Sequence, residues 1–109
     1  MEKIKFSNTG YEVTYRSEEI IFLPREYQLF KFLYQNPSRI FSREELLDAV
    51  WPMEDPVDRT VDDHIYRVRK KIKHLSSVVE IETIRGQGYL QSTKEVHESP
   101  LLKDNEVST

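Results

Sequence analysis

The sequence contains no cysteine, which excludes disulfide bonds, thiolate zinc sites and a cysteine nucleophile. It has only three glycines, and neither a glycine-rich phosphate loop nor a nucleophile elbow is present. No apolar run approaches the roughly 18 residues that a membrane-spanning helix needs. The three histidines, His64, His74 and His97, lack the spacing of metal ligands. We therefore expect a cytoplasmic protein with no enzyme activity, no metal, no cofactor and no membrane partner.

The chain is acidic overall, with a formal net charge of −3, but its charge is unevenly distributed. Residues 59–91 hold seven basic and four acidic side chains, a net of +3, whereas the segments on either side are acidic. A phosphate group responds to charge within about a Debye length, roughly 8–10 Å. This basic segment can therefore attract nucleic acid locally, although such a run can also be a solvated helix face.

The first quarter of the chain predicts a small antiparallel sheet. Apolar residues alternate with polar ones over residues 11–15, which is typical of a half-buried strand. Shorter apolar segments at 4–6 and 20–23 predict a strand on each side of it, with a turn at 8–10. We expect three short strands before the first helix.

Capping signals predict three helices after this sheet. Pro24 suits the first position of a helix that ends near Asn36, before Pro37. Ser42 and Glu45 form a capping box for a second helix, which Pro52 ends. Residues 52–59 are expected to form a loop, and Thr60 is expected to cap a third helix over residues 60–74.

The third predicted helix separates apolar and polar side chains clearly. Its apolar residues follow one narrow stripe: Val61, Ile65, Val68, Ile72 and Leu75. The opposite face carries Tyr66, Arg67, Lys70, Lys73 and His74, with Arg69 and Lys71 on the flanks. A strand over residues 79–84, a turn at 85–88 and a return at 89–90 predict a terminal hairpin. The prediction is one domain over residues 1–91, followed by a polar, disordered tail or linker over 92–109.

Two sequence blocks in this order resemble a known family. They are residues 59–72, RTVDDHIYRVRKKI, and residues 84–89, IRGQGY, supported by LPREY at 23–27 and LLDAVW at 46–51. Together they resemble the OmpR/PhoB-type winged helix-turn-helix effector domain of bacterial response regulators. The resemblance implies an α+β fold with an N-terminal antiparallel sheet, three helices and a C-terminal β-hairpin wing.

The resemblance also implies sequence-specific binding of double-stranded DNA for transcription regulation. The third helix would enter the major groove, and the wing would reach toward the adjacent minor groove. The residues implied to contact DNA are Arg59, His64, Tyr66, Arg67, Arg69, Lys70, Trp51, Thr83, Arg85 and Tyr89. Further implications are head-to-tail pairing on DNA and contact of loop 52–59 with RNA polymerase.

Structural explanations stay open for some of these residues. Asp63 and Arg67 are spaced i,i+4, so Arg67 could pair within its own helix. His64 could be a partly buried helix residue, and Trp51 is expected to be core more than contact. The competing function is a winged helix that binds another protein, which the acidic net charge favours. The third helix favours nucleic acid because its outer face shows Tyr66, arginines and lysines rather than aliphatic anchors. RNA is less favoured because no aromatic stacking platform is evident.

The sequence departs from the family in three respects. Family members normally carry a receiver domain, and the effector domain fills this chain. The chain is therefore either an excised piece or a stand-alone protein under other regulation. The predicted sheet is one strand short of the family's four. Leu23 occupies a helix-cap position where Ser or Thr is usual, which costs about 1 kcal/mol.

Overall fold

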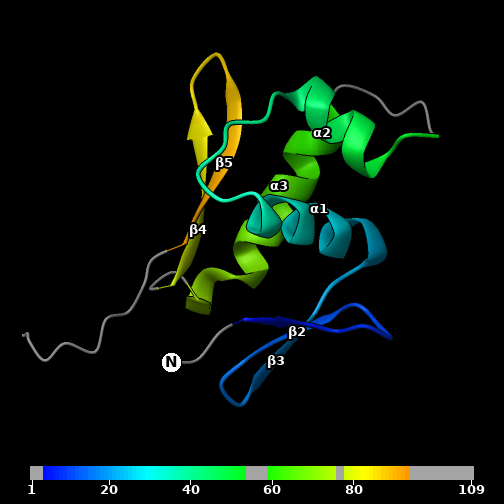
Figure 1. Cartoon of the computed structure of the whole chain (residues 1–109), viewed down its shortest axis with the longest axis vertical. Helices are drawn as coiled ribbons and strands as arrows, with labels where there is room; N and C mark the ends of the chain where they lie inside the picture. The colour runs from blue at the N-terminus through cyan, green and yellow to red at the C-terminus, as the bar shows by residue number, and fades with distance from the viewer. Residues whose placement is uncertain (1–3, 54–58, 76–77, 94–109) are drawn as a thin grey trace, which may run out of the picture.

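A computed structural model describes residues 4–53, 59–75 and 78–93. The chain forms an α+β fold in which two small antiparallel sheets flank three helices (Figure 1). The elements in order are β1 (Lys5–Phe6), β2 (Glu12–Tyr15), β3 (Glu18–Ile21), α1 (Pro24–Gln35), α2 (Arg43–Val50), α3 (Arg59–Lys71), the 3-10 helix η1 (Lys73–Leu75), β4 (Val79–Ile84) and β5 (Gly88–Thr93). The predicted fold class is confirmed.

The N-terminal sheet has the order β1-β2-β3, so the predicted three-stranded meander is confirmed. The prediction of the third strand at 20–23 was wrong by two residues. Arg16 has a φ of 58°, which allows the chain to reverse immediately after β2. Glu18 and Glu19 therefore already pair with β2, although both are exposed. Because both residues are polar, they do not show the apolar alternation from which a strand is predicted.

The first two helices begin and end where the capping signals predict. The Ser42 Oγ accepts a hydrogen bond from Glu45 N at 3.1 Å, and Glu45 Oε1 accepts one from Ser42 N at 2.9 Å. At the start of α1, Leu23 offers no side-chain acceptor. Its own N–H donates to Glu26 Oε1 at 2.9 Å, which supplies one half of a capping box.

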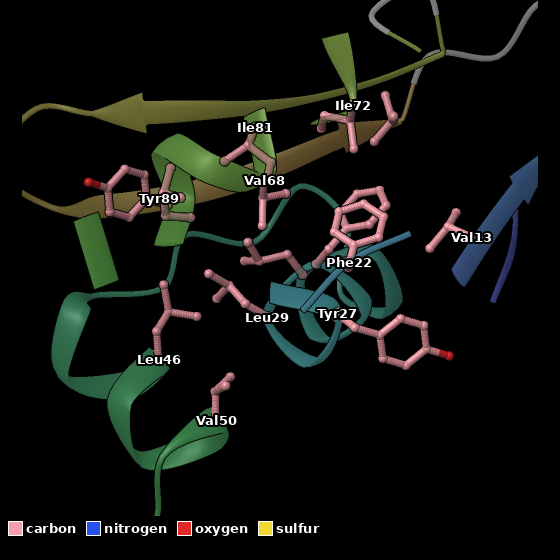
Figure 2. Close-up of a cluster of buried hydrophobic side chains, with 14 of the residues drawn as sticks. Val13, Phe22, Tyr27, Leu29, Leu46, Val50, Val68, Ile72, Ile81 and Tyr89 are labelled. Atoms are coloured by element: carbon pink, nitrogen blue, oxygen red, sulfur yellow. The ribbon is translucent and has the colours of Figure 1, made fainter. Parts of the chain in front are cut away.

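The predicted cap at Thr60 was wrong, because α3 already includes Arg59. A capping residue needs non-helical backbone, and Thr60 lies inside the helix. The predicted apolar stripe is confirmed, since all five of its residues are at most 3% exposed. The predicted end of the helix at residue 74 was wrong, because α3 ends at Lys71 and Leu75 belongs to the separate 3-10 helix η1. This stripe packs against α1 and α2, as Figure 2 shows for Val68 beside Leu29 and Leu46. The buried face of α3 therefore determines which side of the helix is turned outward.

The terminal hairpin of β4 and β5 is joined to the segment between α1 and α2. Phe41 and Tyr89 exchange backbone hydrogen bonds of 2.8 and 2.9 Å. Gly88 permits this approach: its φ is 142°, and a Cβ there would lie 2.0 Å from the Phe41 carbonyl oxygen. The β5 strand includes Ser92 and Thr93, which lie just beyond the predicted domain boundary at residue 91. The rest of the predicted tail, 94–109, lies outside the described residues.

Among the residues that the structure describes, no helix combines the length and hydrophobicity that a membrane crossing needs. The same ranges contain no cluster of three or more acidic or histidine side chains that could hold a metal ion.

Candidate nucleic-acid interface

The outer face of α3 is exposed and mostly basic. Tyr66 is 62% exposed, and Lys70 Nζ lies 5.4 Å from the centroid of its ring. Arg67 is exposed beside them. Within the described chain, no salt bridge or hydrogen bond joins Arg67 to Asp63, so the intrahelical pair considered from the sequence is not formed. The guanidinium of Arg67 is therefore available to a ligand.

Arg69 lies on the flank of α3 and fastens this helix to the wing. Its Nε donates to the carbonyl oxygen of Ile81 at 3.0 Å, and its Nη2 donates to Thr83 Oγ1 at 2.7 Å. Its guanidinium carbon also lies 5.6 Å from the centroid of the Tyr89 ring. Arg69 and Thr83, both predicted to contact DNA, thus contact each other. Their contact with DNA stays a prediction.

A second connection between α3 and the wing centres on Asp62. The Tyr89 hydroxyl donates to Asp62 Oδ1 at 2.5 Å, and Arg43 Nε donates to the same oxygen at 2.9 Å. Tyr89 is only 7% exposed, and Figure 2 shows its hydroxyl directed away from the apolar cluster. Burial, followed by the hydrogen bond to Asp62, raises the pKa of Tyr89. Tyr89 therefore orients the wing whether or not it also contacts DNA.

Arg43 is a candidate interface residue that the sequence analysis missed. It is exposed at the first position of α2 and lines a cleft of about 470 Å³ between α2, α3 and the wing. Thr83, Gly86 and Tyr89 line the opposite side of the cleft. The capping box just before Arg43 was the available signal, since it places this arginine at a helix N-terminus. The cleft itself could not be inferred, because the residues on its other side are distant in sequence.

His64 and Trp51 form the edge of the interface nearest to α2. Trp51 is 4% exposed, which confirms that it belongs to the core. Its ring meets the His64 ring edge-on, with centroids 5.0 Å apart. His64 Nδ1 donates to the Thr60 carbonyl at 2.9 Å, since a carbonyl can only accept. This hydrogen bond leaves the half-buried His64 with Nε2 as its remaining polar atom.

Two predicted residues lie at the ends of this surface. Arg85 is exposed in the turn of the wing, next to Gly86, whose φ is 77°. Arg59 begins α3, and its side chain lies outside the described part of the structure. The structure thus brings Tyr66, Arg67 and Lys70 onto one face and Arg85 to the tip of the adjacent hairpin.

Lys71 and Glu26 hold α3 against the first helix. Lys71 Nζ donates to Glu26 Oε1 at 2.6 Å, and the glutamate is 1% exposed. Burial alone would raise the pKa of Glu26, but the hydrogen bonds from Lys71 and Leu23, with the charges of Lys71 and His64, outweigh it. The pKa of Glu26 is therefore lowered. Glu26 remains ionised inside the protein.

Comparison with known proteins agrees with this geometry. The chain matches the family described as "Transcriptional regulatory protein, C terminal" over residues 17–91. It is 41% identical over 87 residues to the phosphate regulon transcriptional regulatory protein PhoB of Rhizobium meliloti, covering 79% of this chain and 38% of that protein. It is 40% identical over 84 residues to the heme response regulator HssR of Staphylococcus epidermidis, covering 75% of this chain and 38% of that protein.

A solved structure gives the same result for the fold. The DNA-binding domain of the response regulator AdeR, in complex with an intercistronic region, superposes with a TM-score of 0.71 at 26% identity. The match covers 83% of this chain and 94% of that one. The fold, with its exposed basic helix, is a winged-helix domain of the kind found at the C-terminus of transcriptional regulatory proteins. The chain belongs to the OmpR/PhoB-type family of response-regulator effector domains, which is not an enzyme family. It spans 38% of the length of the curated relatives described above.

Proposed function

We propose that this domain docks α3 in the major groove and places its wing near the adjacent minor groove. The observation that carries the proposal is the division of α3 into two faces. Its apolar stripe is buried, while Tyr66, Arg67 and Lys70 are exposed on the other side. Arginine and lysine donors suit phosphate oxygens and the acceptor atoms of guanine in the major groove.

The two connections between α3 and the wing favour a rigid DNA-binding unit that contains both elements. Arg69 joins α3 to Ile81 and Thr83 of β4, and Asp62 joins α3 to Tyr89 of β5. A helix and a hairpin fixed in this way present Arg67 and Arg85 at a constant separation. In this proposal the wing sets the position of the domain, and α3 selects the sequence. His64, Lys70 and Arg59 complete the contacts of the helix, and Trp51, Thr83 and Tyr89 approach the phosphate backbone.

The proposal extends to partners on the DNA. Two domains bind direct repeats head to tail, with half-sites about one helical turn apart. Loop 52–59, of which residues 54–58 lie outside the described structure, contacts RNA polymerase. The protein acts in the cytoplasm and has no catalytic activity of its own.

The salt dependence of binding tests the proposal directly. With about four to six phosphate contacts per domain, log K should fall against log salt with a slope near −0.9 per contact. Raising the salt concentration about fourfold should therefore weaken binding by about 100- to 2000-fold. Fluorescence anisotropy with a labelled duplex measures this slope. An affinity that does not change with salt would contradict the proposal.

A further inference from the structure

Two consecutive carboxylates near the start of α3 have different surroundings. Asp62 accepts hydrogen bonds from Arg43 and Tyr89, so its charge is compensated within the protein. Asp63 is exposed, and among the side chains that the structure describes none forms a salt bridge or hydrogen bond with it. Among the described side chains, Asp63 is thus a carboxylate without a hydrogen-bonding or ionic partner, and it lies on a mostly basic face.

Asp63 belongs to the same face as the proposed DNA-reading residues. Asp63, Tyr66, Arg67 and Lys70 are spaced i, i+3, i+4 and i+7, and all four are exposed. The inference therefore rests on the docking of this face in the major groove, as proposed above. In such a helix the residues nearest the N-terminus contact base edges. Asp63 precedes the other three and is the best placed of them to reach a base.

Only a few groups of the DNA can lie favourably next to the carboxylate of Asp63. It accepts hydrogen bonds but donates none, so phosphate oxygens repel it. Moving it out of water is unfavourable unless a donor replaces the lost water. In the major groove the donors are the N4 amino group of cytosine and the N6 amino group of adenine. Adenine adds the N7 acceptor next to its amino group, which disfavours a carboxylate oxygen there. We infer that Asp63 selects a cytosine at one position of the operator, by accepting a hydrogen bond from its N4 amino group.

The alternative role for Asp63 is to stabilise α3 through the helix dipole. That effect declines beyond the first turn, where Asp62 already supplies a negative charge. A dipole role alone would give no base preference. The two roles therefore differ in a readout that folding stability does not affect.

Selection from random duplex DNA, followed by sequencing, tests the inference. The wild-type domain should enrich a cytosine at one position by about tenfold over other bases, the effect of about 1.4 kcal/mol. Asp63→Ala should lose this preference and keep the other positions of the motif. Asp63→Asn should shift the preference to adenine, which an amide contacts through N6 and N7. Glu19→Gln removes the same charge from an exposed position in β3 and should leave the motif unchanged.

A single-atom change in the DNA gives an independent measurement. Replacing the selected cytosine by 2-pyrimidinone removes its N4 amino group. Wild-type affinity should fall about tenfold, whereas Asp63→Ala should bind both duplexes equally. If both Asp63 variants select the wild-type motif, or if both proteins respond alike to 2-pyrimidinone, Asp63 does not read cytosine. If the wild-type domain enriches no motif at all, the proposed docking fails as well, so the two failures are distinguishable.

Discussion

Lys71 and Glu26 form an ion pair of 2.6 Å that connects the end of α3 to the first turn of α1, across 45 residues of sequence. The two side chains differ in exposure: 33% for Lys71 and 2% for Glu26. The buried carboxylate therefore depends on a partner whose own charge is partly solvated. The same carboxylate accepts the Leu23 N–H, so the pair also stabilises the start of α1.

Lys71→Met should lower the free energy of unfolding by about 1–3 kcal/mol, because it leaves a buried carboxylate without its charged partner. This decrease in the free energy of unfolding is smaller than for a fully buried ion pair, since Lys71 is partly exposed to solvent. Urea denaturation measures the difference. Lys73→Met, an exposed lysine in η1, is the matched control and should change stability by less than about 0.5 kcal/mol. Equal effects of the two substitutions would show that the pair contributes nothing.

The lowered pKa of Glu26 predicts a dependence of stability on pH. Its pKa lies below its ordinary value of 4.5 in the folded state, so ionised Glu26 stabilises the fold above that pH. This contribution is lost as pH falls below 4.5 and through the folded-state pKa. The fall in stability on acidification should therefore be shallower in Glu26→Gln than in the wild type. Denaturation at a series of pH values from neutral to acidic measures both slopes, and parallel curves would contradict the assignment.

The two glycines of the wing should respond differently to alanine. At Gly88 a Cβ would meet the Phe41 carbonyl oxygen at 2.0 Å, and its φ of 142° disfavours any side chain. Gly88→Ala should cost about 3–5 kcal/mol of folding free energy, from backbone strain and steric overlap together. Gly86 also has a positive φ, but no atom lies within 4 Å of a Cβ placed there. Gly86→Ala should cost only about 1–2 kcal/mol. Thermal unfolding of the two variants measures the contrast, which fails if Gly88→Ala is as stable as Gly86→Ala.

Arg67 and Arg85 should separate base reading from positioning. Arg67→Ala should cost about 1–3 kcal/mol on the preferred site and flatten selectivity at one base pair. Arg85→Ala should weaken preferred and scrambled duplexes more equally and lower the salt slope by about one unit. Titration of each variant against both duplexes decides between these outcomes. Full selectivity in Arg67→Ala would remove Arg67 from the base-reading residues.

The sequence predicts most of the fold because its signals are local. The capping box of Ser42 and Glu45, the stop near Asn36 and the apolar stripe of α3 each depend on neighbours within a few residues, and all are confirmed. Boundaries were less accurate where polar residues join an element. The start of β3 at Glu18 and the end of β5 at Thr93 were both missed for this reason.

The interface could be predicted less completely because its contacts are long-range. The sequence places Arg69 on a flank of α3 but does not reveal the carbonyl of Ile81 that it reaches. Likewise, Tyr89 was selected as a DNA contact, whereas the Asp62 carboxylate that accepts its hydroxyl became evident only in the structure. Arg43 was overlooked because its role depends on the same oxygen of Asp62. A family resemblance indicates which residues belong to a surface, but not which of them contact one another.

The division of α3 into a buried and an exposed face also has an evolutionary consequence. Substitutions at exposed positions usually change stability by no more than about 0.5 kcal/mol. The residues that fix α3 in the fold, such as Val61 and Val68, are different from those that face outward, such as Asp63 and Arg67. Selection can therefore alter the outward residues, and with them the operator preference proposed above, while the scaffold stays folded. A duplicated gene could in this way acquire a new set of target promoters through a few changes on one surface of a single helix.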